Sequence, residues 1–356
     1  MRVLVAGGGT AGHIEPALNL ADELRRRDEA TEILALGTSR GLEVSLVPAR
    51  GYELALIPAV PMPRKLTLDL LKLPLRLRQA IKETRAIIDG SNIDVVVGFG
   101  GYVSIPAYFA ARNNTPYVVH EANARPGIAN RIGARFANAV AECVPGSLAH
   151  AVVTGNPLRQ SIARLDRAAM REQARAHFGI PNSTLVVLVF GGSLGAQSLN
   201  RVIGEVVGDN ILGDVVILHS YGNKNDAPAL ASDHYVPLPY IEHMDLAYAA
   251  ADFVICRSGA MTVAELTAVG LPACYVPLPH GNGEQSLNAA PVLAAGGGII
   301  VEDAQFSKTF VREVLVPLLA DQERLSTMAR NARSIGKPDA AERLADLVES
   351  VAGGKR

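Results

Sequence analysis

A glycine turn near the start of the chain has the residues and spacing of a phosphate-binding site. Residues 7–12 read Gly-Gly-Gly-Thr-Ala-Gly and follow a short apolar run at residues 3–6. Apolar residues then recur at helical spacing, which predicts a strand, a tight turn and a helix that begins near His13. The free N–H groups at such a helix start bind anions, and glycine lets the backbone approach phosphate closely.

The same arrangement recurs in the second half of the chain. An apolar run at residues 185–190 precedes Gly191-Gly192-Ser193-Leu194-Gly195, and helical spacing resumes at residues 199–206. We interpret Ser193 as a hydroxyl and backbone contact to phosphate. Two such units predict two nucleotide-binding-type halves that face one another.

Each of the two glycine motifs also fits another class of enzyme. Residues 7–12 fit the dinucleotide fingerprint, which needs an acidic residue at the end of the second strand. That strand ends Leu-Gly-Thr-Ser-Arg at residues 36–40, so NAD is disfavoured, and Arg40 leaves an NADP oxidoreductase as an alternative. Residues 191–195 fit the nucleophile elbow of a serine hydrolase, but a hydrolase has no need of the first glycine turn.

Three further stretches carry side chains for ligand contacts. The turn at residues 98–102 follows a predicted strand, and a phosphate contact and a simple close-packed turn remain equally open. Ser258 or Gly259 is predicted to cap a helix that carries Glu265, whose carboxylate can accept two hydrogen bonds from a ribose diol or complement the helix dipole. Residues 284–288 open another helix, whose amides either contact sugar hydroxyls or are solvated.

A basic, leucine-rich stretch runs from Lys65 to Arg78, with Pro74 inside it. A core helix with a solvated basic face is one interpretation, and Pro74 is expected to kink or restart it. The leucines exceed what one buried stripe requires, so contact with a membrane surface is the other interpretation.

The composition is that of an ordinary globular protein with room for two cores. The chain has 356 residues, 49% of them hydrophobic and 19% charged, with a formal net charge of −1. This balance gives no indication of nucleic-acid binding. The three cysteines form no Cys-x-x-Cys pair and are expected to be reduced. The sequence shows no secretory signal and no apolar run of the about 18 residues that a membrane span needs. No spacing of His, Cys or acidic residues predicts a metal site.

Strand-like and helix-like runs alternate along the whole chain, which predicts an α/β fold with parallel sheets covered on both faces. Strands are expected at residues 3–6, 32–36, 53–58, 94–99, 117–120, 139–143 and 151–154, and then at 185–190, 215–219, 235–238, 253–256, 273–276 and 298–301. The linker is expected at residues 155–165. The last three helices are expected at residues 310–319, 324–335 and 340–351.

Five separated motifs occur together and in order, at residues 8–13, 120–123, 154–159, 191–196 and 257–265. In these motifs the chain resembles the MurG family, the UDP-N-acetylglucosamine: undecaprenyl-diphospho-muramoylpentapeptide N-acetylglucosaminyltransferases of bacterial peptidoglycan synthesis. The resemblance covers essentially the whole chain. It implies the GT-B fold, in which two Rossmann-like domains face one another across a cleft.

The resemblance also implies the reaction and the place where it occurs. GlcNAc would pass from UDP-GlcNAc to the C4 hydroxyl of the MurNAc of lipid I, with inversion, to give lipid II. No cofactor is implied. The enzyme would act as a peripheral protein at the cytoplasmic face of the cell membrane. Residues 1–157, joined by the helix at 340–356, would bind lipid I and the membrane, and residues 158–339 would bind the donor.

The site residues are carried over from the motifs of this family. The acceptor diphosphate would lie against Gly8, Gly9, Gly98, Gly100, Gly101 and Tyr102. The UDP-GlcNAc contacts would be Thr10, Ala11, Gly12, Asn123, Arg159, Ser193, Ile241, Ala260, Met261, Thr262, Val263, Ala264, Glu265, Gln285 and Asn288. Arg159 and Ser193 would contact the diphosphate, Ile241 the uracil and Glu265 the ribose, and Gln285 with Asn288 would contact the GlcNAc hydroxyls.

His13 is the available general base for the attacking hydroxyl, although a hydrogen bond to the lipid diphosphate remains an alternative role. The chain departs from the family where Ala11, Ala122 and Glu284 stand, which are commonly glycine, glutamine and glutamine. The departure at Glu284 puts the sugar contact of that position in doubt. A non-catalytic protein that binds nucleotide sugars or polyprenyl lipids is a further alternative, because it would keep the glycine turns but would not need His13.

Overall fold

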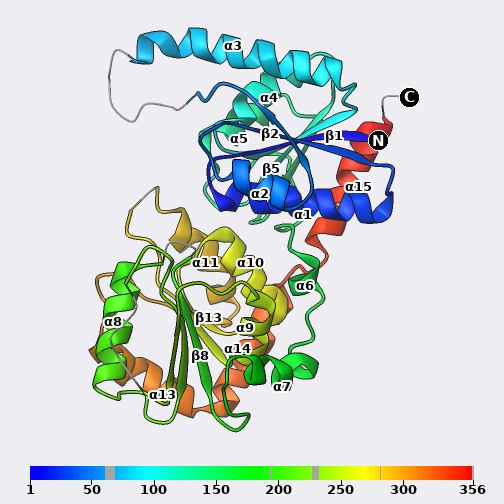
Figure 1. Cartoon of the computed structure of the whole chain (residues 1–356). Helices are drawn as coiled ribbons and strands as arrows, with labels where there is room; N and C mark the ends of the chain where they lie inside the picture. The colour runs from blue at the N-terminus through cyan, green and yellow to red at the C-terminus, as the bar shows by residue number, and fades with distance from the viewer. Residues whose placement is uncertain (61–68, 193–194, 227–231, 281, 355–356) are drawn as a thin grey trace. The chain divides into compact units, whose positions relative to one another are not determined.

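The computed structural model of the chain describes residues 1–60, 69–192, 195–226, 232–280 and 282–354, and residues 69–72 by their backbone alone. The chain divides into two compact units (Figure 1). Unit 1 comprises Met1–Leu158 and Asp339–Arg356, and unit 2 comprises Arg159–Pro338.

In the described part of unit 1, seven parallel strands form a sheet of order β3-β2-β1-β4-β5-β6-β7. The order reverses beside β1, and in such sheets ligands bind at the carboxyl ends of the strands next to the reversal. The strands are β1 (Arg2–Gly7), β2 (Glu32–Gly37), β3 (Glu53–Leu56), β4 (Val95–Gly100), β5 (Tyr117–Glu121), β6 (Ala139–Glu142) and β7 (Val152–Val153).

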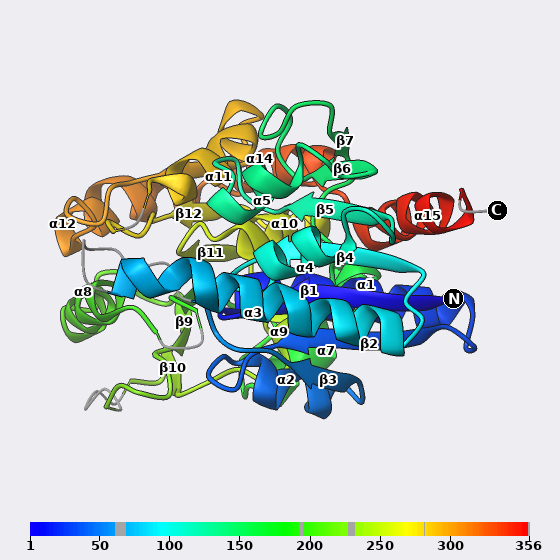
Figure 2. The same ribbon diagram turned by 90° about the horizontal axis from the view of Figure 1, so that it is seen from above.

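The two faces of this sheet carry separate apolar cores because side chains alternate along each strand. Val3 and Val5 face one core with α1, α2 and α15, whereas Leu4 and Ala6 face the other with α3 and α4 (Figure 2). The helices of unit 1 are α1 (Ala11–Arg27), α2 (Glu43–Ala49), α3 (Asp69–Gly90), α4 (Ser104–Ala111), α5 (Ile128–Gly133) and α15 (Ala340–Gly353).

In the described part of unit 2, six parallel strands form a sheet of order β10-β9-β8-β11-β12-β13. The strands are β8 (Val186–Phe190), β9 (Val216–Ser220), β10 (Tyr235–Leu238), β11 (Phe253–Cys256), β12 (Ala273–Tyr275) and β13 (Gly298–Ile300). The helices are α6 (Gln160–Ala163), α7 (Arg167–His177), α8 (Gln197–Gly208), α9 (Met244–Ala250), α10 (Ala260–Val269), α11 (Glu284–Ala294), α12 (Lys308–Phe310), a π-helical turn η1 (Val311–Leu315), α13 (Val316–Ala320) and α14 (Gln322–Ile335).

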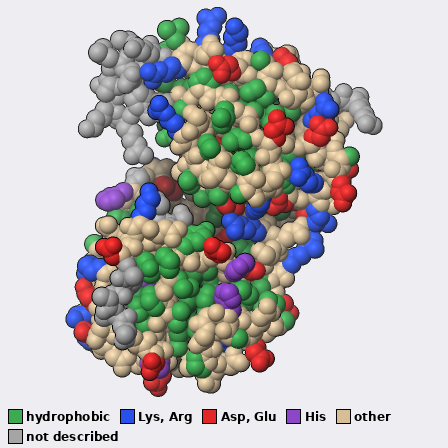
Figure 3. Space-filling view, viewed as in Figure 1, with side chains coloured by type: hydrophobic (Ala, Val, Ile, Leu, Met, Phe, Trp, Pro, Cys, Tyr) green, Lys and Arg blue, Asp and Glu red, His purple; other side chains and the backbone are tan. Residues whose placement is uncertain are grey.

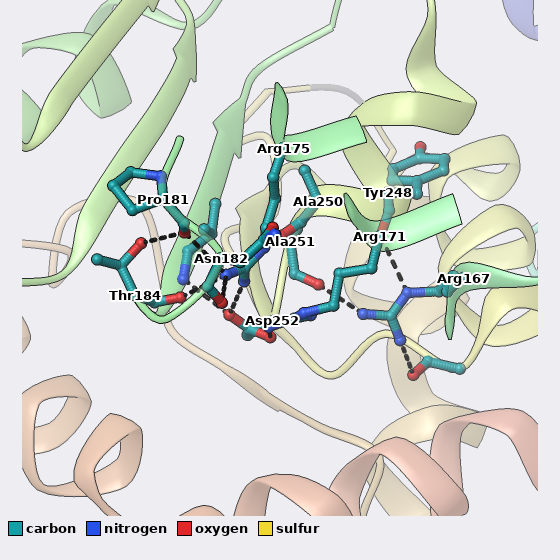
Figure 4. Close-up of polar contacts among 12 residues, drawn as sticks. Arg167, Arg171, Arg175, Pro181, Asn182, Thr184, Tyr248, Ala250, Ala251 and Asp252 are labelled. Carbon is teal, nitrogen blue, oxygen red and sulfur yellow. Dashed lines mark hydrogen bonds and ion pairs between the residues drawn. The ribbon is translucent and has the colours of Figure 1, made fainter. Parts of the chain in front are cut away.

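Three arginines on one face of α7 attach this helix to the end of α9 and to the segment between α9 and β11 (Figure 4). Arg171 and Arg175 bind the two oxygens of Asp252 at 2.7 and 2.9 Å. Arg167 donates to backbone carbonyls, among them that of Tyr248 at 2.9 Å, and burial lowers its pKa to about 10. Asp252 also accepts from the amide that opens β8, so this network stabilises the amino ends of the strands.

The α/β fold with two parallel sheets is confirmed, and each predicted strand is present with its ends shifted by at most two residues. Three details of the prediction were wrong. Helix α3 does not restart at Pro74, and α6 forms inside the expected linker. The helix expected at residues 310–319 begins earlier, at Lys308, and contains the π-helical turn η1.

Candidate functional site

The first glycine turn of unit 1 joins β1 directly to the start of α1, two residues before the predicted start at His13. Thr10 is the extended residue before the helix, and its carbonyl accepts from the amides of His13 and Ile14. No hydrogen-bond acceptor is found among the described residues for the amides of Ala11 and Gly12. These amides therefore have the free N–H groups that an anion can use.

The second glycine turn, residues 98–102, packs against the first. Gly101 has a φ of +82° and lies so close to the Gly8 carbonyl that any side chain there would overlap it. Gly9, with a φ of +90°, faces the Tyr102 ring, which a Cβ at residue 9 would meet at 3.6 Å. The two stretches predicted to contact the acceptor diphosphate therefore lie side by side at the carboxyl ends of β1 and β4.

The side chain of His13 lies between these two turns. Its Nδ1 is 3.2 Å from the hydroxyl of Thr10, and a Cβ at Gly100 would lie 3.1 Å from its Nε2. Burial lowers the pKa of His13 below 6.5, while the carboxylate of Glu121 and the backbone of Gly8 act in the opposite direction. The imidazole is therefore neutral at pH 7, as a general base must be.

Glu43 is a residue of this site that the sequence analysis missed. Its side chain is 1% exposed, and its carboxylate accepts from the Gly9 amide at 3.1 Å and from the Thr38 amide and hydroxyl at 2.9 and 3.1 Å. The dinucleotide fingerprint places its acid at the end of the second strand, whereas Glu43 lies beyond that strand end in the sequence, at the first residue of α2. The first turn of α2 places Glu43 beside that strand end.

A second buried carboxylate shapes the segment that carries Asn123. Glu121 accepts from the backbone amides of Asn123 and Gly127 at 2.9 and 3.0 Å, and from the side chain of Asn130 at 3.0 Å. It thus fixes the loop between β5 and α5, where Asn123 is half-buried. Within the motif at residues 120–123, Glu121 thus holds this loop, and its negative charge also acts on the pKa of His13.

In unit 2, the motif at residues 257–265 forms the end of β11 and the first turns of α10. Gly259 precedes the helix in an extended conformation, so Gly259 rather than Ser258 is the capping residue. Glu265 accepts a 2.7 Å hydrogen bond from the hydroxyl of Tyr248, a fully buried residue of α9 that the sequence analysis missed. This bond fixes one oxygen of the carboxylate predicted to hold the ribose.

The start of α11 lies beside the start of α10. Asn288 donates to the Ser258 carbonyl at 3.4 Å and is 3% exposed, and Gln285 accepts from the Leu278 amide at 2.9 Å. The predicted donor residues on these elements are therefore gathered at the carboxyl end of the sheet. They comprise Ala260, Met261, Thr262, Val263, Ala264, Glu265, Gln285 and Asn288.

The other donor residues lie on separate segments. Ile241 is 3% exposed in the segment before α9, and Arg159 precedes α6, which packs against α10. Ser193 lies outside the described residues. Thr10, Ala11, Gly12 and Asn123 belong to unit 1.

The described residues hold no group of three or more His, Cys, Asp or Glu side chains arranged to bind a metal ion. Cys256 and Cys274 are buried in neighbouring strands, and burial raises the pKa of both thiols. Within the described residues, no helix is both long enough and apolar enough to cross a bilayer.

Comparisons with known proteins agree on one family. Residues 3–142 match the glycosyltransferase family 28 N-terminal domain, and residues 186–344 match the family 28 C-terminal domain. A relative from Nocardia farcinica is 55% identical over 99% of this chain and 96% of its own length. A relative from Saccharopolyspora erythraea is 57% identical over 99% and 94%. Both are named UDP-N-acetylglucosamine--N-acetylmuramyl-(pentapeptide) pyrophosphoryl-undecaprenol N-acetylglucosamine transferase.

A solved structure gives the same result. The crystal structure of Acinetobacter baumannii MurG superimposes with a TM-score of 0.78 at 29% sequence identity and covers 98% of this chain and 99% of that one. The two domain matches, the identity of the relatives over nearly the full length and this structural likeness show that the chain belongs to the MurG family of the family 28 glycosyltransferases.

Proposed function

We propose that this protein transfers GlcNAc from UDP-GlcNAc to the C4 hydroxyl of the MurNAc of lipid I, with inversion, and so forms lipid II for peptidoglycan synthesis. Relatives that are 55–57% identical over nearly the whole chain carry the name of this reaction, which supports the proposal. A fold alone does not imply a function, so the residues of each unit carry the rest of the argument.

Unit 2 is the donor-binding unit in this proposal. The main support for this assignment is the carboxylate of Glu265 on the second turn of α10, which a hydrogen bond from Tyr248 holds in place. A carboxylate accepts through two oxygens, which is the chemistry that a pair of ribose hydroxyls requires. The amides that open α10 have no intrahelical acceptor and favour a negatively charged group. The departing UDP diphosphate is such a group, and Arg159 and Ser193 are proposed as its further contacts.

Unit 1 is the acceptor-binding unit in this proposal. The resemblance gives Ala11 and Gly12 as donor contacts, but their backbone amides open α1 beside the paired glycine turns. We therefore assign these two amides to the diphosphate of lipid I. His13 accepts the proton of the attacking hydroxyl as that oxygen bonds to the anomeric carbon of the donor and UDP leaves. Its lowered pKa supports the role because a neutral imidazole is required.

The lipid tail of the acceptor requires a membrane surface close to unit 1, and we assign this contact to the start of α3. Of the stretch from Lys65 to Arg78, residues 65–68 lie outside the described residues. Leu75 is 70% exposed beside the exposed Arg76 and Arg78, whereas Leu73 and Leu77 pack against the core. Lys and Arg side chains follow the upper edge of unit 1, where α3 lies (Figure 3). The protein would then be peripheral on the cytoplasmic side of the membrane.

Nucleotide titration tests this proposal against its alternatives. UDP and UDP-GlcNAc should bind in calorimetry and NADP should not, and no cofactor should be needed for turnover. Binding of NADP in place of UDP would contradict the proposal. Binding of UDP-GlcNAc and lipid I without any transfer would instead support a non-catalytic binding protein.

A further inference from the structure

The carboxylate of Glu43 connects three segments of unit 1. One oxygen accepts from the Gly9 amide in the first glycine turn, and the other accepts from the amide and hydroxyl of Thr38 at the end of β2. The side chain itself extends from the start of α2 and is 1% exposed. Both oxygens are therefore bound to groups of the protein itself.

The neighbouring glycines leave room for this side chain. A Cβ at Gly8 would lie 3.3 Å from the Glu43 carboxylate, and a Cβ at Gly37 would lie 2.5 Å from its Cγ. A Cβ at Gly41 would overlap the carboxylate itself. Gly8, Gly37 and Gly41 thus surround the Glu43 side chain without side chains of their own, and a larger residue at these positions would crowd it.

The carboxylate of Glu43 lies at the end of β2, the position in the fold where a dinucleotide site has its acidic residue. In that type of fold an acid near the end of the second strand holds a ribose hydroxyl. Here the acid is buried and its oxygens are occupied by Gly9 and Thr38. This geometry disfavours a dinucleotide in unit 1 and leaves the glycine turn for another phosphate-bearing ligand.

We propose that Glu43 is a positioning residue for the lipid acceptor, an inference that rests on the proposed transferase function. Gly9 has a φ of +90°, which glycine adopts freely, so the bond to Glu43 is what fixes the orientation of its peptide. The same peptide unit carries the Gly8 carbonyl, which packs against Gly101, and the Cα of Gly9 that follows it faces the Tyr102 ring. The amide of Gly9 is used by Glu43, so the amides of Ala11 and Gly12 are the ones that bind the acceptor diphosphate.

Two variants of Glu43 test the inference through steady-state kinetics with each substrate. Glu43→Gln places an NH₂ group against an N–H donor, and Glu43→Asp keeps the charge but shortens the side chain. Both should lower kcat/KM for the lipid I analogue by about tenfold or more, the equivalent of one lost hydrogen bond to a charged group. The KM for UDP-GlcNAc should stay within about twofold, because unit 2 is unchanged.

Glu23→Gln is the matched control. Glu23 is likewise a buried carboxylate of unit 1, 3% exposed and bound to Arg26 and Arg27, but it lies roughly 18 Å along α1 from the glycine turn. It should lower the melting temperature without a selective effect on the acceptor. Glu43 variants that match Glu23→Gln in acceptor kinetics at a similar loss of stability would overturn the inference. Absence of GlcNAc transfer by the unsubstituted protein would instead contradict the proposed function.

Discussion

The imidazole ring of His13 lies directly against Gly100. A Cβ at residue 100 would lie 3.0 Å from Cδ2 of His13 and 3.1 Å from its Nε2, and Gly100 has a φ of +99°. Any side chain at residue 100 would therefore displace the ring or strain the backbone. The second glycine turn thus holds the ring of the proposed base in place as well as lying beside the first turn.

His13→Ala should lower kcat by about 10²–10⁴-fold, the usual effect of losing a general base. Affinity for UDP-GlcNAc should change little. Because burial lowers the pKa of His13 below 6.5, kcat of the unsubstituted protein should fall on the acid side of that value. The variant should lack this acid limb. A variant that keeps kcat and the acid limb, and loses only affinity for lipid I, would assign His13 to diphosphate binding.

Glu265→Ala should weaken the binding of UDP and UDP-GlcNAc together. Loss of a charged acceptor from a buried diol costs about 1.5–3 kcal/mol, or roughly 10- to 100-fold in affinity. Tyr248→Phe keeps the carboxylate and removes only its 2.7 Å hydrogen bond, so a smaller loss is expected. Calorimetry measures both. Unaltered UDP affinity in Glu265→Ala would show that this carboxylate serves only the helix dipole.

Leu75 and Leu77 form a matched pair for the membrane contact of α3. Leu75 is 70% exposed, so Leu75→Ser should weaken binding to anionic vesicles and leave the melting temperature unchanged. Leu77 packs against the core, so Leu77→Ser should cost roughly 1–3 kcal/mol of stability. Vesicle binding should weaken as salt rises, because the attraction is screened. Equal vesicle binding by Leu75→Ser and the unsubstituted protein would rule out this contact.

His219 should make the stability of unit 2 depend on pH. It is fully buried in β9, and burial lowers its pKa to about 4. Its Nδ1 lies 2.8 Å from the Tyr235 hydroxyl and its Nε2 lies 3.1 Å from Oδ1 of Asn200. The unfolded state takes up a proton near pH 6.5 that the folded state does not, so stability falls as the pH falls through that range. Between pH 7 and 5 the loss is about 2 kcal/mol.

Urea unfolding at pH 7 and pH 5 measures this dependence. His219→Gln should reduce it by about 2 kcal/mol. The fully buried His120 of unit 1, whose pKa burial also lowers to about 4, should account for a further part. His243→Gln, at an exposed histidine of unit 2, should leave the dependence unchanged. An equal pH dependence in all three proteins would contradict the assignment of this effect to His219.

The fold was predictable because both sheets are parallel and buried on both faces. Strands such as β1 and β8 contain continuous apolar runs that lead directly into glycines, and this pattern is visible without any tertiary information. Pro74 is a counter-example. A proline inside a helix favours a kink or a restart. Helix α3 nevertheless continues through Pro74, and Leu73 and Leu77 near it pack against the core.

The sequence indicates candidate site residues where a motif is continuous, and it does not indicate the partners that come from distant segments. The sequence places His13 after the first turn but does not show that Gly100 packs against it. Glu43 and Tyr248 carry no local motif, and only the fold brings them to Gly9 and Glu265. The burial that sets the pKa of His13 is likewise a tertiary effect.

The most direct measurement follows labelled GlcNAc from UDP-GlcNAc to a lipid I analogue, with and without EDTA. A lipid-linked disaccharide and free UDP should form in equal amounts. The rate should be the same in EDTA, because helix amides and side chains rather than a metal stabilise the departing diphosphate. Release of UDP without labelled lipid, or activity lost in EDTA and restored by added metal, would contradict the proposed transferase function.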